Sequence, residues 1–261
     1  METKQQKFQS NEEIKEQIEK CIDWIRDLVK TANCKGVLVG LSGGIDSAVV
    51  ANLLVRAFPQ NSLGVILPVS SSNEDSDHAT KVAEKCKIKS IEIDLTEEKN
   101  SILYKTDKAL KEFRAPGYGN RKLSDGNLRA RLRMSTLYAI ANEMNYLVVG
   151  TDNRAELYTG YFTKYGDGGV DILPLASLLK KEVYQWGEYF GVPEEIINKN
   201  PSAGLWDGQS DEEELGISYE KIDLYLMGND IPEKDKLLLK KLHLSTEHKR
   251  KMPPIFELKN D

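Results

Sequence analysis

The stretch "LVGLSGGIDSAVV" (Leu38–Val50) combines a short apolar strand, a turn with two glycines and the start of a helix. When a turn joins a strand to a helix, the first backbone N–H groups of the helix point outward without partners. This arrangement is typical of a phosphate-binding turn. Gly43 and Gly44 allow positive φ angles and a close approach of the backbone to an anion. The lysine of the ordinary phosphate loop, G-x-x-x-x-G-K-[ST], is missing, and Asp46 stands in the turn instead.

Asp46 distinguishes this turn from an ordinary phosphate loop. A carboxylate repels a bare phosphate, so the turn works as a phosphate site only with a cation between the two groups. Mg²⁺ suits that position, because it binds one or two carboxylates together with phosphate oxygens. The alternative is that Asp46 or Ser47 serves only as a helix N-cap, which leaves the glycine pair unexplained. The turn therefore predicts a magnesium-assisted phosphate site, with Ser42 and Ser47 as hydroxyl donors.

Short apolar segments alternate with helical patterns along the chain. The expected strands are Gly36–Leu41, Leu63–Val69, Lys89–Leu95 and Tyr146–Gly150. The expected helices are 11–30, 46–58, one ending near 86, 97–113, 128–144 and 176–190, with residues 115–127 as a loop. This alternation predicts an α/β fold, a doubly wound and mostly parallel sheet with helices on both faces, in one domain over residues 1–261.

A second loop, Thr151–Glu156, also follows an expected strand and should face the same crevice as the glycine turn, at the carboxyl ends of the strands. Asp152 and Glu156 are four residues apart and are expected on one face of a short helix, where a carboxylate could meet Asp46 and share a metal. The alternative is that both only favour the positive end of that helix. The following "FTKYGDGGVD" (Phe162–Asp171) places three glycines among aromatic rings, which indicates a loop that holds a polar ligand.

Composition limits the possible partners. The 36 basic and 41 acidic residues give a net charge of −5, so the surface as a whole is not a nucleic-acid footprint. The polar N-terminus does not resemble a signal peptide, and no run of 18 apolar residues predicts a membrane span. Three widely spaced cysteines without a C-x-x-C pair indicate free thiols in a reducing compartment. We therefore expect a cytoplasmic protein with small-molecule substrates, without nucleic acid or membrane partners.

Four motifs carry a resemblance to known enzymes, in that family's order. "SGGIDS" (Ser42–Ser47) is similar to the signature of the ATP pyrophosphatases, which adenylate a substrate and release diphosphate. The other three, "GTDNRAELYTGYFTKYGDGGVD" (Gly150–Asp171), "EELGISYEKIDLYL" (Glu213–Leu226) and "STEHKRKMPP" (Ser245–Pro254), closely resemble the ammonia-dependent NAD synthetases. The resemblance covers Asn11–Pro254. It implies a ligase that converts deamido-NAD, ATP and ammonia into NAD, AMP and diphosphate through a deamido-NAD adenylate.

The same resemblance implies roles for individual residues. Contacts with ATP are expected from Gly40, Leu41, Ser42, Gly43, Gly44, Ile45, Asp46, Ser47, Thr151, Lys180 and Ser202. Magnesium is expected on Asp46 and Glu156, and deamido-NAD on Arg131, Lys164, Asp171, His248 and Lys249. Lys180 and Lys181 are adjacent, so alignment alone chooses between them, and Ser202 stands where threonine is more usual. A homodimer with the deamido-NAD site at the subunit boundary is also implied.

Some basic residues have simpler alternatives. Arg129 and Arg133 share one face of the expected helix, and Arg131 lies roughly opposite, so the resemblance selects Arg131 for the substrate. Without the resemblance, "EHKRK" (Glu247–Lys251) would be a solvated basic tail.

Two other functions are compatible with the glycine turn. Another ATP pyrophosphatase, such as a tRNA-modifying adenylating enzyme, needs a basic tRNA-binding surface, which the net charge opposes. A non-catalytic nucleotide-binding module has no use for two separated metal carboxylates or for Phe162–Asp171. Glutamine-using relatives carry an extra amidase domain, for which these motifs leave no room in 261 residues, so free ammonia is the expected nitrogen donor. The polar segments Ser70–Asp77 and Ala203–Glu213 are expected to order over the ligands.

Overall fold

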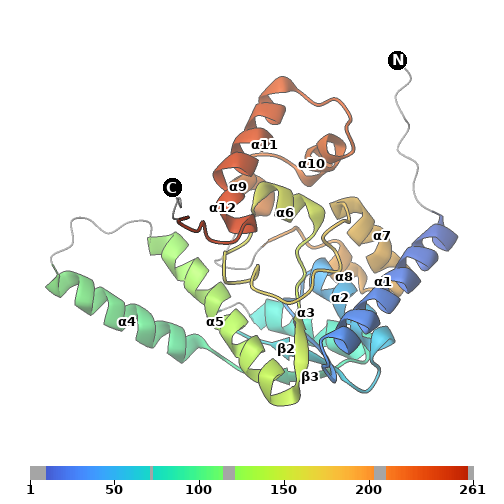
Figure 1. Cartoon of the computed structure of the whole chain (residues 1–261), viewed down its shortest axis with the longest axis horizontal. Helices are drawn as coiled ribbons and strands as arrows, with labels where there is room; N and C mark the ends of the chain where they lie inside the picture. Colours follow the sequence, from blue (N-terminus) through green and yellow to red (C-terminus); the bar gives the residue numbers. More distant parts are fainter. Residues whose placement is uncertain (1–9, 71–72, 114–120, 203–209, 258–261) are drawn as a thin grey trace.

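Four parallel strands form a central sheet in the order β3-β2-β1-β4. They are β1 (Gly36–Gly40), β2 (Ser62–Ile66), β3 (Lys89–Glu92) and β4 (Tyr146–Val149). Leu38 of β1 lies beside Leu63 of β2 and Val148 of β4. The computed structural model describes residues 10–70, 73–113, 121–202 and 210–257 (Figure 1). The predicted parallel α/β sheet is confirmed.

Helices connect the strands and continue beyond the sheet. Those before β4 are α1 (Asn11–Thr31), α2 (Ile45–Ala57), α3 (Asn73–Cys86), α4 (Thr96–Glu112) and α5 (Arg121–Met144). Those after β4 are α6 (Arg154–Thr159), α7 (Lys180–Phe190), α8 (Glu194–Ile197), α9 (Asp211–Leu215), α10 (Tyr219–Leu226), α11 (Glu233–Ser245) and α12 (Glu247–Arg250). Within the described ranges, none of these helices has both the length and the apolar character needed to cross a membrane.

The two faces of β1 are buried against different helices. Val37 and Val39 lie in one hydrophobic cluster with residues of α1, α2 and α7, whereas Leu38 lies in a second cluster with α5. Alternate residues of a strand point to opposite faces, so a strand that is apolar at every position needs cover on both sides. Helices therefore pack on both faces of the sheet, as the sequence predicts.

The start of α5 differs from the prediction of a loop over residues 115–127. Residues 121–127 are helical, and the earlier part of that loop lies outside the described residues. Gly126 and Asn127 disfavour a helix in isolation. However, Asp125 forms an ion pair of 2.7 Å with Arg129 one turn later, and the Thr163 hydroxyl donates to the Asn127 side chain at 2.8 Å. Tertiary contacts thus override local propensity at this point.

The start of α7 also differs from the prediction. The helix begins at Lys180, whereas the sequence predicted a start near residue 176. Leu179 is extended, with φ −67° and ψ 156°. The Asp223 carboxylate accepts the backbone N–H groups of Lys180 and Lys181 at 3.1 Å and 3.0 Å. This side chain from α10 fixes where the first turn of α7 starts.

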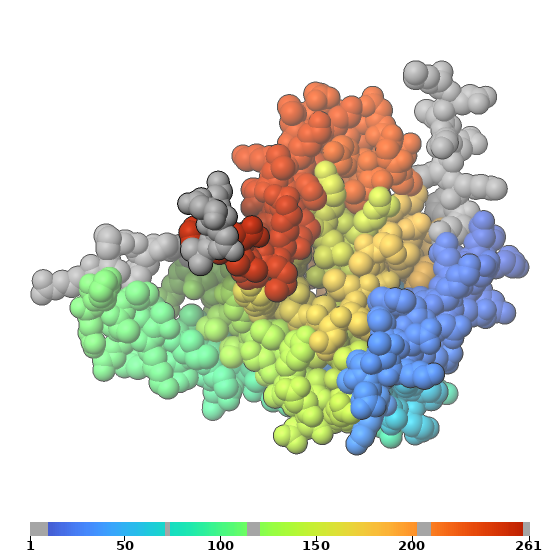
Figure 2. Space-filling model, viewed as in Figure 1, coloured from blue at the N-terminus to red at the C-terminus, as the bar shows by residue number. Residues whose placement is uncertain are grey.

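Helices α6, α9, α10 and α11 form a third hydrophobic cluster. Ala155 of α6, Leu215 of α9, Ile222 of α10 and Leu239 of α11 are buried together there. In the space-filling view, the orange-to-red segment forms a lobe next to the α/β layers (Figure 2). This lobe matters for the site because α10 contacts both α6 and α7.

The two segments expected to order over ligands are only partly described. Residues 71–72 and 203–209 lie outside the described residues, whereas Asn73–Asp77 belongs to α3 and Asp211–Glu213 to α9. Ordering on ligand binding therefore stays a prediction.

Candidate active site

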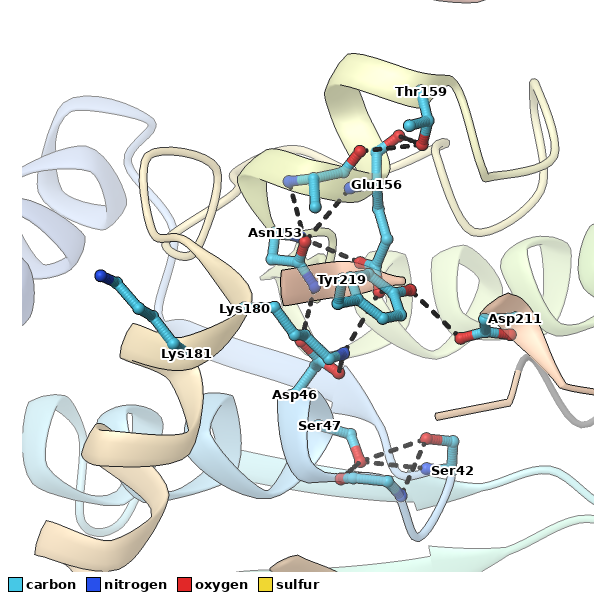
Figure 3. A network of polar contacts seen from close by, with 12 residues as sticks. Ser42, Asp46, Ser47, Asn153, Glu156, Thr159, Lys180, Lys181, Asp211 and Tyr219 are labelled. Atoms are coloured by element: carbon cyan, nitrogen blue, oxygen red, sulfur yellow. Dashed lines mark hydrogen bonds and ion pairs between the residues drawn. The ribbon is translucent and has the colours of Figure 1, made fainter. Parts of the chain in front are cut away.

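The glycine turn leads directly from β1 into α2. The Ser47 hydroxyl donates to the Gly44 carbonyl at 2.9 Å and accepts the backbone N–H of Ser42 at 3.3 Å, so the two serines hold the turn closed. The N-cap of α2 is Gly44, which has no side chain to satisfy the first N–H groups of the helix. These groups are the donors that an anion site needs. Figure 3 shows the turn below the polar contacts described next.

Individual positions in the turn have different access to a ligand. The side chains of Leu41 and Ile45 are buried in the hydrophobic core, so only their backbones can contact ATP. Gly43 has φ +76°, and a Cβ atom there would lie 2.7 Å from both the Asp75 carbonyl oxygen and the His78 Cβ. Position 43 thus needs glycine, because its φ angle is positive and because a side chain there would collide with α3.

The second loop differs in detail from the prediction. Asp152 and Glu156 do not share a helix face, because Asp152 precedes α6 and Asn153 is the N-cap. The Asn153 side chain accepts the N–H groups of Ala155 and Glu156, and the Glu156 carboxylate accepts the backbone N–H of Asn153 at 3.0 Å. This reciprocal capping box fixes the direction of the Glu156 side chain. The pattern N-x-x-E is its sequence signal, and Asn153 could have been found from it.

Lys180 brings the two loops together. Its Nζ atom lies 2.6 Å from Asp46 Oδ2 and 3.5 Å from Glu156 Oε1. Asn153 Nδ2 donates to the other oxygen of Asp46 at 2.9 Å. Asp46 and Glu156 therefore meet at one point, as their positions after β1 and β4 predict (Figure 3). Lys181 points away from this point, and its Nζ contacts the sulfur of Met227.

Two acids of the segment after β4 hold protons more tightly than usual. Burial raises the pKa of Glu156 to about 7, and Asp46 adds to the rise while Lys180 opposes it. Burial, together with the charges of Asp167 and Glu156, raises the pKa of Asp152 well above its ordinary value. Asp152 Oδ2 is buried and has no hydrogen-bond partner within the part of the chain that the structure describes. Desolvation and the neighbouring carboxylates thus favour the neutral form of both acids.

The Lys180 ammonium forms ion pairs with Asp46 and Glu156. Burial alone would lower the pKa of Lys180, but Asp46 and Glu156 raise it above its ordinary value. Lys180 is only 3% exposed and is therefore a buried cation held by two carboxylates.

Residues of α9 and α10 complete this region, and the sequence analysis gave neither Asp211 nor Tyr219 an individual role. The Tyr219 hydroxyl lies 3.3 Å from Glu156 Oε1 and 3.2 Å from Asp211 Oδ2. The Lys180 Nζ atom lies 4.8 Å from the centre of the Tyr219 ring. Tyr219 lies within the motif Glu213–Leu226, but the motif alone did not indicate which of its residues reach the site.

Four of the five residues expected to bind deamido-NAD form one group. Lys164 Nζ donates to the His248 carbonyl at 2.6 Å, and Arg131 lies 3.4 Å from the Lys164 carbonyl. Lys249 Nζ donates to the carbonyls of Gly160 and Phe162 at 2.8 Å and 2.7 Å. Lys249 is thus anchored to the loop before Lys164, and the basic segment around it is a short helix and not a solvated tail.

Asp171 lies apart from these four residues. Its carboxylate accepts the Tyr138 hydroxyl at 2.9 Å and the backbone N–H of Val148 at 2.8 Å. Tyr138 and Arg131 are seven residues apart on α5, so they lie on the same face about two turns apart. An extended substrate along this face could reach both.

The neighbouring arginines have other partners. Arg129 pairs with Asp125, and the half-buried Arg133 donates to the Leu67 carbonyl at 3.0 Å. Arg131 is exposed, which agrees with its selection for the substrate.

Two expected ATP contacts lie at the border of this region. Thr151 is half-buried directly after β4, next to Asp152. Ser202 is exposed, and the carbonyl of the preceding Pro201 accepts the backbone N–H of Asp211 at 3.1 Å. Ser202 is thus tied through the backbone to the residue that contacts Tyr219.

The donor atoms around Lys180 fit a magnesium ion bound together with phosphate. Asp46 and Glu156 supply hard carboxylate oxygens, which already converge on one cation. No group of three or more His, Cys, Asp or Glu residues arranged for a metal exists among the described residues. A metal here would take its remaining ligands from a nucleotide and water, as Mg²⁺ usually does.

Comparison with known proteins agrees with this geometry. The sequence profile of the NAD synthase family matches residues 17–253. The chain belongs to this family. An NH(3)-dependent NAD(+) synthetase of Alkaliphilus oremlandii is 58% identical over 92% of this chain and 96% of that protein. The match sets aside the tRNA-modifying enzymes and the non-catalytic module as alternatives.

Solved structures of NAD synthase family members and related enzymes share the fold. The NMN synthetase from Francisella tularensis superimposes with a TM-score of 0.87 at 37% identity, covering 97% of this chain and 100% of that chain. The NH3-dependent NAD synthetase from Campylobacter jejuni superimposes with a TM-score of 0.74 at 31% identity. This match covers 94% of this chain and 99% of that chain. The family's adenine-nucleotide hydrolase-like fold is therefore the fold of this chain.

Proposed function

We propose that this member of the NAD synthase family converts deamido-NAD, ATP and ammonia into NAD, AMP and diphosphate. The convergence of Asp46 and Glu156 on Lys180, next to an uncapped helix start, carries the proposal. The 58% identity to an enzyme named for this activity supports it. All of residues 1–261 act as one synthetase domain in this proposal.

The first step activates a carboxylate. The nicotinate carboxylate of deamido-NAD attacks the α-phosphorus of ATP, a phosphorus–oxygen bond to the β-phosphate breaks, and diphosphate leaves. The glycine turn binds the leaving diphosphate through the backbone of Ser42–Ser47, and Lys180 adds a positive charge. Thr151 and Ser202 supply hydroxyls to the rest of ATP.

Magnesium is the proposed metal, held by Asp46 and Glu156. When bound, it neutralises charge on the diphosphate as that group leaves. Asn153 keeps the two carboxylates directed toward each other, because its backbone N–H donates to Glu156 and its side-chain amide donates to Asp46.

The second step forms the amide. Neutral ammonia attacks the carbonyl carbon of the adenylate, a carbon–nitrogen bond forms, AMP leaves, and a proton is lost from nitrogen.

Deamido-NAD is proposed to bind along α5, with Arg131, Lys164, His248 and Lys249 near one part of the substrate and Asp171 near another. Its negative charges need cations beyond those that contact ATP. The proposal includes a homodimer with this site at the subunit boundary, and a cytoplasmic location with reduced cysteines.

A second candidate substrate is nicotinate mononucleotide. The structural similarity to an NMN synthetase favours it, because the same activation and amide-forming steps on the smaller nicotinate substrate give NMN. The identity to NAD synthetases is higher, so deamido-NAD is the first choice.

One assay tests both substrates. The purified chain is incubated with ATP, Mg²⁺ and ammonium, and with either deamido-NAD or nicotinate mononucleotide. We expect NAD, AMP and diphosphate in equal amounts with deamido-NAD, and little product when glutamine replaces ammonium. A higher kcat/KM for nicotinate mononucleotide would show that the second candidate is correct.

A further inference from the structure

The segment Gly216–Asp223 has no role in the proposed reaction, although two of its residues contact Glu156 or the start of α7. Tyr219 and Asp223 are four residues apart and lie on one face of α10. They are 5% and 2% exposed, respectively. Asp223 accepts the first two backbone N–H groups of α7, and Tyr219 contacts Glu156 and the Lys180 ammonium. A helix without a proposed ligand contact therefore touches both Glu156 and the segment that carries Lys180.

The Glu156 carboxylate is held at both oxygens. Oε2 accepts the backbone N–H of Asn153 at 3.0 Å, and Oε1 lies 3.3 Å from the Tyr219 hydroxyl (Figure 3). With both oxygens held, the carboxylate plane cannot rotate freely. Oε2 still has a lone pair for another partner, whereas Oε1 also lies 3.5 Å from Lys180 Nζ.

We infer that Tyr219 is a positioning residue for the metal-binding carboxylate of Glu156, an inference that rests on the proposed function. The Tyr219 hydroxyl fixes the carboxylate in the orientation that a magnesium ion on ATP requires. Residues that hydrogen-bond a metal ligand typically change metal affinity 10- to 100-fold when they are replaced.

Asp211 gives the hydroxyl a second partner. A hydroxyl has one proton, so Tyr219 donates to Glu156 or to Asp211 at any moment. Asp211 opens α9 and is bonded through its backbone to Pro201, the residue before Ser202. The same hydroxyl therefore connects Glu156 with the segment that holds the last expected ATP contact.

Tyr219→Phe tests this inference, because it removes the hydroxyl and keeps the buried ring and its contact with Lys180. Tyr225→Phe is the matched control. Tyr225 lies on the same helix and packs in the same cluster, and its hydroxyl lies 3.2 Å from that of Tyr158, which is not a carboxylate. The melting temperature of both variants is measured first to establish that they fold.

The measurement is the Kd for ATP by calorimetry, once in excess Mg²⁺ and once in EDTA. For Tyr219→Phe, we expect the Kd in Mg²⁺ to rise about 10-fold and the Kd in EDTA to stay unchanged. For Tyr225→Phe, we expect neither value to change. In a Glu156→Gln background, Tyr219→Phe should have no further effect, because its partner is already altered.

Two results would overturn the inference. An unchanged Kd in Mg²⁺ would show that the hydroxyl does not act on the metal site. An equal loss in Mg²⁺ and in EDTA would show a general structural effect on the nucleotide site. If the wild-type chain makes no NAD but the metal-dependent change is observed, the proposed function fails while the role of Tyr219 stands.

Discussion

The Nζ atom of Lys180 lies 2.6 Å from Oδ2 of Asp46, although 134 positions separate the two residues in the sequence. Lys180 begins α7, and Asp46 lies in the first turn of α2. Lys180 is buried and Asp46 is partly exposed, and Glu156 lies 3.5 Å from the same ammonium. Without a nucleotide, the lysine thus occupies the position where the two carboxylates converge. We expect it to move toward phosphate oxygens when ATP and Mg²⁺ bind.

Replacing Lys180 should impair both activity and stability. Lys180→Met removes the cation between two partly buried carboxylates, so we expect the melting temperature to fall. Turnover should fall roughly 10²-fold, the scale of losing one electrostatic stabiliser. Lys181→Met is the matched control, because Lys181 contacts Met227, and it should leave kcat near the wild-type value. Equal losses in the two variants would contradict the assignment.

Asp46→Asn should lose turnover by roughly 10²-fold at saturating Mg²⁺. The amide is nearly isosteric, but it is a much weaker metal ligand and no longer pairs with Lys180. Initial rates over a range of Mg²⁺ concentrations measure the effect. Near-normal turnover at high Mg²⁺ would remove Asp46 from the metal site.

The metal-free protein should become less stable as the pH rises between about 4.5 and 7. Glu156 has an ordinary pKa of 4.5 and a pKa of about 7 in the folded chain, so folding favours its protonated form. Its contribution to stability is complete below the unfolded pKa and is lost as the pH rises through about 7. Asp152 shifts in the same direction. Urea unfolding in EDTA across this range should show a smaller decrease for Glu156→Gln than for the wild type.

Arg131→Ala and Lys249→Ala should raise the KM for deamido-NAD by about 10-fold or more, and the KM for ATP much less. The two variants should differ in stability. Arg131 is exposed and has a single long contact of 3.4 Å, whereas Lys249 holds two backbone carbonyls. Only Lys249→Ala is therefore expected to lower the melting temperature. A variant with a higher KM for ATP alone would reverse the assignment.

The sequence predicted the parts of the site that lie next to the strands. The position of Asp46 after β1 and of Glu156 after β4 follows from apolar strands that end at polar loops, and parallel strands bring such loops together. The choice between Lys180 and Lys181 could not be made, because adjacent residues differ only in which side of the helix they occupy. That side is set by Asp223, 43 positions from Lys180, and no local pattern records such a contact.

The errors have the same origin. Residues 121–127 contain Gly126 and Asn127 and read as a loop, but Arg129 and Thr163 stabilise them as a helix. Asp152 and Glu156 have helical spacing, yet α6 begins only after its N-cap, Asn153, so Asp152 lies outside the helix. Tyr219 received no individual role from the sequence, and its ring is buried. Its hydroxyl contacts residues from two other helices, which only the tertiary structure reveals.

Because Gly43 lies in close contact with α3, we expect the glycine turn and α3 to open as one unit. Gly43 packs against backbone atoms of Asp75 and Ala79 and against the Cβ atom of His78. Amide hydrogens exchange through local opening, and ligands that bind only the closed state slow that opening. Diphosphate bound to the turn should therefore slow amide exchange along α3, including residues that never touch the anion.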